Sequence, residues 1–90
     1  MNAVWRSIEI SNRRGLHARA SAKFVTLATA LGALIEVEKD GSRVCGTSIM
    51  GLMMLGAAKG DSVIIHVSGA GADEALAKLV RLIEERFGED

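Results

Sequence analysis

The sequence predicts an α+β sandwich in which helices cover one face of a sheet and the other face meets water. Apolar residues alternate with polar ones in several short segments, and they recur at intervals of three and four in longer segments. These segments follow one another as strand, helix, strand, strand, helix, strand, helix. The 90 residues contain no proline, linker or internal repeat. We therefore expect a single domain over residues 1–90.

A short loop separates the first predicted strand from the first predicted helix. From Val4 to Ile10 apolar and polar residues alternate, apart from a break at Trp5 and Arg6, which predicts a half-buried strand. Ser11 to Gly15 is typical of a loop. The apolar stripe that follows predicts a helix closed by Gly32, with a core face of Ala20, Phe24, Leu27, Ala28 and Leu31.

The middle of the chain predicts a hairpin followed by a compact helix. From Ala33 to Val37 apolar residues alternate with glutamate, and Asp40-Gly41 favours a tight turn because both residues tolerate positive φ. A short third strand is expected around Arg43 to Cys45. The apolar segment from Ser48 to Leu55 predicts the second helix, with Thr47 and Ser48 as candidate N-caps and Gly56 after its end.

The last third of the chain predicts a fourth strand and a final helix. Val63, Ile65 and Val67 alternate with polar residues, which is typical of a half-buried strand. Asp73 and Glu74 suit the positive N-terminus of a helix. The apolar stripe of that helix consists of Leu76, Leu79, Val80, Ile83 and Phe87.

Composition excludes several classes of protein. Eleven lysines and arginines balance eleven acidic residues, so no long-range field attracts nucleic acid or an anionic membrane. The single Cys45 cannot form an internal disulfide, and no signal segment or membrane-spanning run is present, which predicts a cytoplasmic protein. Two histidines and one cysteine do not have the spacing of a zinc site, and we expect neither a metal nor a cofactor.

The segment from Asn12 to Ala20 lies where a loop is predicted to become a helix. A helix N-terminus presents unpaired amides and a partial positive charge, which together bind phosphate well. His17 is expected at this point with Arg19 close by, and a neutral imidazole is a nucleophile near pH 7. Alternatively, His17 is a polar cap and the arginines are a solvated rim. Position alone does not decide between these readings.

Two motifs, GLHAR at residues 15–19 and SIMGLMMLG at residues 48–56, resemble those of HPr, the histidine-containing phosphocarrier family of the bacterial phosphotransferase system. The resemblance covers essentially the whole chain, including the order of strands and helices, the Asp40-Gly41 hairpin and the segments that flank the last strand. It implies an antiparallel four-stranded open-faced sandwich with three helices on one side, in the order βαββαβα.

The resemblance also implies a function and its residues. His17 is then the phosphorylated residue, charged by enzyme I from phosphoenolpyruvate and discharged to an enzyme IIA-type domain, while Arg19 assists the phosphoryl group. Ser48 matches the regulatory serine that an HPr kinase/phosphorylase modifies in some members. Such a protein is a phosphocarrier and not an enzyme, and we expect a monomer. Whether it serves sugar uptake, nitrogen control or another branch is open.

One residue departs from the family pattern. The family usually has proline directly after the arginine, where this chain has Ala20. Proline stiffens the first helical turn and carries no amide hydrogen, whereas alanine leaves the turn freer and adds a donor. Alanine at this position puts the rigidity of the active centre in doubt. It affects the expected carrier role less, because His17 and Arg19 are both present.

The second helix is too apolar for its length to bury all of its side chains. Methionine suits surfaces that meet several partners, so we interpret Ile49, Met50 and Met53 as a docking surface. Leu52 and Leu55 are expected to face the core. Alternatively, all of these residues cap the core. Gly51 in mid-helix indicates a close approach of another part of the chain.

The remaining chemistry-bearing residues have ordinary interpretations. Ser48 is a helix cap whether or not a kinase modifies it. His66 is expected on the open face of the sheet, and Cys45 is expected to pack without reactivity. Two rival functions remain: a regulatory module that binds an anion at the same helix start, and an enzyme with His17 as nucleophile. The enzyme is disfavoured because no second histidine or carboxylate lies near the loop in sequence, although folding could bring one there.

Overall fold

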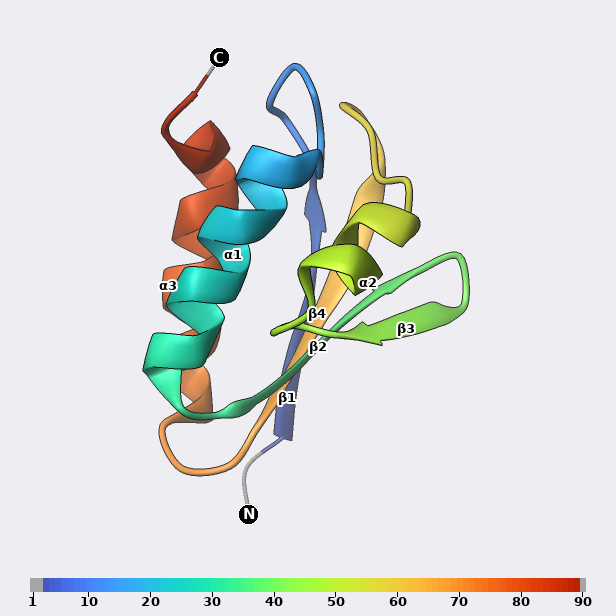
Figure 1. The fold of residues 1–90 in the computed structure, drawn as a ribbon. Coiled ribbons are helices and arrows are strands. Elements are labelled where there is room, and N and C mark those ends of the chain that lie inside the picture. The colour runs from blue at the N-terminus through green and yellow to red at the C-terminus, as the bar shows by residue number, and fades with distance from the viewer. Residues whose placement is uncertain (1–2, 90) are drawn as a thin grey trace.

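The computed structural model describes residues 3–89 and has the predicted order of elements (Figure 1). Three helices and four strands are joined by short loops, and a single 3₁₀ turn follows the last helix. In chain order they are β1 (Ala3–Glu9), α1 (Ala18–Leu31), β2 (Leu34–Lys39), β3 (Ser42–Cys45), α2 (Ile49–Met54), β4 (Ser62–Ser68), α3 (Ala72–Glu84) and η1 (Arg86–Gly88).

The four strands form one antiparallel sheet in the order β1-β4-β2-β3. Its register places Val37 opposite Ile65, so that the apolar residues of β2 and β4 share one face. The hairpin between β2 and β3 turns at Asp40 and Gly41, whose φ angles of 50° and 83° are both positive, as expected for this turn. The predicted open-faced arrangement is confirmed.

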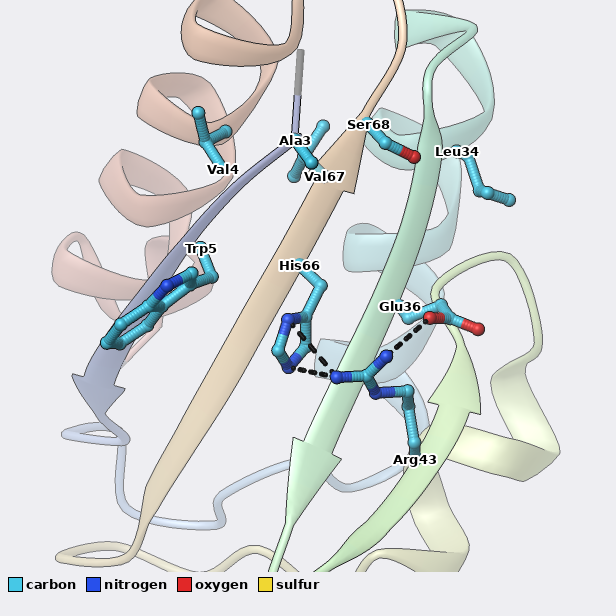
Figure 2. Close-up of a pocket in the computed structure, with 9 residues that line it drawn as sticks. All are labelled: Ala3, Val4, Trp5, Leu34, Glu36, Arg43, His66, Val67 and Ser68. Carbon is cyan, nitrogen blue, oxygen red and sulfur yellow. Dashed lines mark hydrogen bonds and ion pairs between the residues drawn. The ribbon is translucent and has the colours of Figure 1, made fainter. Parts of the chain in front are cut away.

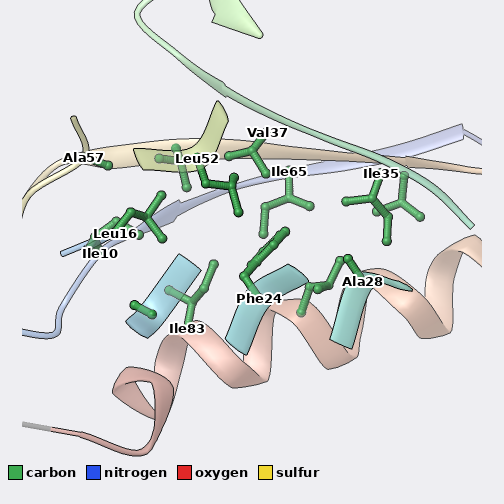
Figure 3. Close-up of a cluster of buried hydrophobic side chains, with 14 of the residues drawn as sticks. Ile10, Leu16, Phe24, Ala28, Ile35, Val37, Leu52, Ala57, Ile65 and Ile83 are labelled. Carbon is green, nitrogen blue, oxygen red and sulfur yellow. The ribbon is translucent and has the colours of Figure 1, made fainter. Parts of the chain in front are cut away.

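The core lies between the sheet and helices α1 and α3 (Figure 3). Phe24 of α1 and Ile65 of β4 are completely buried there, and Leu52 reaches the same cluster from α2. Leu27 and Leu31, predicted on the core face of α1, are only partly buried at its edge. Figure 1 shows α2 beside α1, and α2 also packs against the edge strand β3.

Several predicted boundaries differ from the observed ones. The first strand ends at Glu9, and Ile10 is buried just beyond it with its amide bonded to Asp61. The last helix ends at Glu84, so the prediction that Phe87 belongs to its stripe is wrong. Phe87 has a left-handed backbone with a φ of 56° and reaches the core from η1. The prediction that the Phe87 side chain is buried is confirmed. Periodicity of apolar residues could not reveal that the backbone turns after Glu84, because it assumes a continuous helix.

Candidate functional site

The loop between β1 and α1 is held against the segment that follows α2. Gly15 has a φ of 65°, and a Cβ there would collide with the carbonyl oxygen of Ala57. Glycine therefore permits both the backbone conformation and the close approach. The next residue completes the attachment, because the amide of Leu16 donates to the Ala57 carbonyl at 2.9 Å. Asn12 is buried in the same loop and donates through Nδ2 to the Gly15 carbonyl at 2.8 Å.

His17 lies at the N-terminus of α1, as the sequence predicts. Its backbone is extended, with φ −72° and ψ −178°, and its side chain makes no capping hydrogen bond. The first helical bond runs from the amide of Ser21 to the carbonyl of His17 at 2.9 Å. The amides of residues 18–20 therefore have no acceptor within the helix. The imidazole is therefore not used as a cap, and the helix start keeps its unpaired donors.

Ala20 is the third residue of this helical turn. Its side chain is completely buried, and its amide is one of the three that precede the first helical bond. The turn thus forms without proline, and alanine contributes a donor that proline would lack. Any effect on rigidity or rate stays a prediction.

Folding brings to His17 a carboxylate that sequence reasoning missed. Oε1 of Glu89 lies 2.7 Å from Nε2 of His17, although the two residues are 72 positions apart. Asn12 Nδ2 donates to the same oxygen at 3.1 Å. The hydrogen bond from His17 holds the pKa of the Glu89 carboxyl below its usual range, so the carboxylate is ionised at neutral pH. Phe87, an apolar residue close to the end of the chain, was the sequence signal that this segment folds back.

The surface around His17 is a shallow hollow of about 230 Å³. It is lined by His17 and Glu89 together with three arginines, Arg13, Arg14 and Arg19. The arginines are exposed, and their formal charge exceeds that of the single carboxylate. Arginine donors and free helix amides are a suitable environment for a phosphoryl-sized anion next to the imidazole. The geometry thus places Arg19 beside His17, as expected.

Helix α2 presents apolar side chains to solvent, and we call Ile49, Met50 and Met53 the α2 patch. Met50 is 69% exposed and the other two are about 40% exposed. Met54, outside the predicted set, is exposed as well, whereas Leu52 is completely buried and Leu55 is partly buried. The alternative that the α2 patch caps the core is therefore wrong. Its role in docking stays a prediction.

Ser48 is the N-cap of α2. Its Oγ accepts a hydrogen bond from the amide of Gly51 at 2.9 Å. A Cβ at Gly51 would lie 3.2 Å from Cβ of Val44 in β3, which is closer than ordinary packing allows. The close approach that the sequence indicated at Gly51 is thus between α2 and the edge strand. Ser48 has the capping role, and the alternative cap Thr47 does not.

The other predicted residues lie apart from His17. His66 is on the open face, as expected, where it contacts Arg43 in a pocket shared with Trp5 (Figure 2). The prediction that Cys45 packs inside is wrong: Val44 faces α2, so its neighbour in the strand is exposed. A hydrogen bond with Thr47 lowers the pKa of the Cys45 thiol. Within residues 3–89, no three potential ligands cluster as a metal site, and no helix is long and apolar enough to cross a membrane.

Fold and site together define a small open-faced α+β protein that presents one histidine at a helix N-terminus among arginines. A sequence model described as the PTS HPr component phosphorylation site matches residues 4–85. A Phosphocarrier protein HPr of Neisseria meningitidis is 52% identical over 83 residues, which are 92% of this chain and 93% of the relative.

Solved structures agree with these sequence matches. An HPr crystal structure from Thermoanaerobacter tengcongensis has a TM-score of 0.90 and 46% identity, covering 100% of this chain and 99% of the other. One from Bacillus anthracis has a TM-score of 0.87 and 37% identity, covering 92% and 99%. The chain belongs to the HPr family. It is a phosphocarrier of the phosphotransferase system, and not an enzyme.

Proposed function

We propose that the chain carries its phosphoryl group on the imidazole of His17. In this proposal enzyme I, charged from phosphoenolpyruvate, is the donor, and an enzyme IIA-type domain is the acceptor. The observation that carries the proposal is the position of His17 at the start of α1, between free helix amides and the arginines of the hollow. No other imidazole in the chain has such an environment, because His66 lies within β4.

The surroundings of His17 suit both receipt and release of the group. A neutral ring nitrogen attacks phosphorus, and the bond between phosphorus and the donor breaks with its electron pair leaving on the donor. The amides of residues 18–20 and the Arg19 guanidinium stabilise the charge on the transferring oxygens. Because the hollow is open, a second protein can reach the phosphorylated ring directly.

The α2 patch is the surface on which donor and acceptor dock in turn. It is apolar and exposed, and it belongs to a helix that packs beside α1 (Figure 1). Flexible methionine side chains adapt to partners of different shape. A carrier that must meet soluble partners of this kind acts in the cytoplasm, as a monomer whose patch is free.

Phosphorylation of Ser48 by an HPr kinase/phosphorylase is the proposed regulation. In the free protein a phosphate at the N-cap meets the positive end of α2, a stabilisation of about 0.3 to 1 kcal/mol. In a docked complex the same dianion lies beside Met50 against an apolar partner surface, where its desolvation costs several kcal/mol. The modification therefore blocks docking without changing the fold.

The decisive experiment is phosphoryl transfer from phosphoenolpyruvate through purified enzyme I, with the modified residue mapped by mass spectrometry. We expect one acid-labile phosphohistidine, at His17, and loss of the label when an enzyme IIA-type domain is added. A reversible complex with phosphate but no covalent product would instead indicate a module that only binds anions. A label at His66 would contradict the assignment.

A further inference from the structure

The contact between Glu89 and His17 is not required merely to present an imidazole at a helix start. The Nε2–Oε1 distance is 2.7 Å, and about four-fifths of each side chain is buried, with 22% of His17 and 17% of Glu89 exposed. Oε1 also accepts from Nδ2 of Asn12, a residue that is itself completely buried. A carboxylate with two donors on one oxygen is held in a defined position, unlike an exposed surface ion pair.

The chain reaches this position through a costly reversal after α3. Arg86 and Phe87 both have left-handed backbones, with φ of 57° and 56°, which non-glycine residues rarely adopt. The turn is held by the burial of Phe87 and by Lys23 of α1, whose Nζ donates to the Phe87 carbonyl at 2.6 Å. Figure 1 shows that the turn ends beside the start of α1. Both anchors hold Phe87, two residues before Glu89, and so direct Glu89 toward His17.

A carboxylate at Nε2 decides which ring nitrogen carries the proton. An ionised carboxylate oxygen only accepts, so Nε2 of His17 must be the protonated nitrogen in this hydrogen bond. In a neutral imidazole the other nitrogen, Nδ1, then has the free lone pair. The same arrangement of carboxylate, imidazole and reacting atom fixes the tautomer in the hydrolytic triads, where the carboxylate itself stays unprotonated.

We propose that Glu89 is a positioning residue for phosphoryl transfer: it fixes the orientation and the Nε2–H tautomer of His17 so that Nδ1 faces the donor. This inference rests on the proposed carrier function of His17. In the transfer, the Nδ1 lone pair forms the bond to phosphorus while the bond from phosphorus to the donor breaks, and the electron pair leaves with the donor. The proton on Nε2 stays in place throughout.

Glu89 also acts on the charge that develops. Once Nδ1 is bonded to phosphorus, the ring that keeps its Nε2 proton gains positive charge, and the carboxylate next to Nε2 stabilises it. The phosphoryl oxygens, bonded to phosphorus at Nδ1, would meet the arginines Arg13, Arg14 and Arg19, which line the same hollow as His17 and Glu89. When the phosphoryl group passes to the acceptor, the ring returns to its neutral form without any proton transfer. This property suits a carrier that must both accept and donate the group.

The test combines a spectroscopic signature with a rate. Ring ¹⁵N chemical shifts at neutral pH are expected to show Nε2 protonated in wild type, and a mixture of tautomers in Glu89→Ala. Phosphorylation by enzyme I is expected to be about ten- to hundredfold slower in Glu89→Gln and Glu89→Ala, the loss typical of a hydrogen bond to a charged group. Glu89→Asp keeps the charge and is expected to recover part of the rate.

Glu85→Gln is the matched control, since Glu85 is an exposed glutamate in the same reversal that does not contact His17. It should keep the wild-type tautomer and rate. Unchanged tautomer and rate in Glu89→Ala would overturn the proposal, and so would a slower rate with an unchanged tautomer or a faster rate in Glu89→Gln. If wild type itself forms no phosphohistidine, the proposed carrier function of His17 is rejected. This result differs from the outcomes that reject only the positioning role of Glu89.

Discussion

His17 and His66 each have a glutamate oxygen within hydrogen-bond distance, yet the backbone around the two histidines differs. Nε2 of His17 lies 2.7 Å from Glu89, and Nε2 of His66 lies 2.8 Å from Glu38. Burial does not distinguish them either, since the two imidazoles are 22% and 24% exposed. The difference is the backbone: His17 precedes a helix whose first amides are unpaired, whereas His66 lies in the middle of a central strand.

A histidine–carboxylate pair is therefore not by itself a reactive site. At His66 the pair is part of a charge network with Arg43, which lies 3.0 Å from the ring and 3.3 Å from Glu36 (Figure 2). Neighbouring strand amides are committed to the sheet and cannot bind a transferring group. At His17 free amides and arginines surround the ring, which gives a phosphoryl group somewhere to bind.

The largest expected effect comes from removing each imidazole in turn. His17→Ala is expected to abolish phosphoryl acceptance from enzyme I, because no other nucleophile lies at the helix start. His66→Ala is expected to be labelled at the wild-type rate. Radiolabelled transfer together with circular dichroism of both variants makes the measurement. Undiminished labelling of folded His17→Ala would contradict the assignment of His17 as the residue that accepts the phosphoryl group.

Phosphorylation of Ser48 is expected to slow phosphorylation of His17 by about a hundredfold or more, since a docking deficit of about 2.7 kcal/mol has that effect. The phosphorylated protein is expected to melt no lower than the unmodified one. Ser48→Ala is the control: it removes the cap, worth about 1 kcal/mol, and leaves transfer intact. Equal transfer rates with and without the phosphate would reject the switch, and a sharply lower melting temperature would mean that the phosphate disrupts the fold.

Two exposed apolar side chains test where partners dock. Met50→Asp in the α2 patch is expected to weaken binding of both enzyme I and an enzyme IIA-type domain at least tenfold, because docking would bury an unpaired carboxylate. Trp5→Asp is the matched change on the open face, where the tryptophan is 66% exposed, and we expect unchanged affinities. Titration calorimetry measures both. Equal losses of affinity in the two variants would contradict the proposal that partners dock on the α2 patch and not on the open face.

A smaller effect is expected from the arginines. Arg19→Ala is expected to slow transfer about tenfold without preventing it, because the amides of the first helical turn still hold the phosphoryl group. Arg43→Ala, which disrupts the network around His66, is expected to leave the rate unchanged. Single-turnover kinetics compares the two. A wild-type rate in Arg19→Ala would show that this arginine is a solvated residue beside His17 with no role in transfer.

The smallest effect concerns stability in acid, where the two regions are expected to behave alike. The hydrogen bond from His17 lowers the pKa of Glu89, and that from His66 lowers the pKa of Glu38. Each carboxylate therefore adds stability that is complete above the ordinary pKa of about 4.3 and is lost as the pH falls through the lowered value. Melting temperatures of Glu89→Gln and Glu38→Gln are expected to fall less than that of wild type on acidification. Parallel curves for all three would contradict these contributions.

Local patterns predicted much of the site as well as the fold. Gly51 was identified as a point of close approach, His17 as the residue at the helix start and Ser48 as a cap, and the structure confirms each position. These features depend on a few neighbouring residues, whose backbone preferences act over short distances. Cys45 was misread because its exposure depends on which face of an edge strand α2 covers.

By itself, the sequence determined the order of elements, the apolar faces that form the core and the place of His17 at the start of α1. Side-chain periodicity and capping preferences are local, so they can be read without knowing the fold. Only the tertiary structure decided that Glu89 meets His17 and that Glu38 meets His66. The first contact depends on a left-handed reversal and the second on strand register, and both are set by packing between residues far apart in the chain.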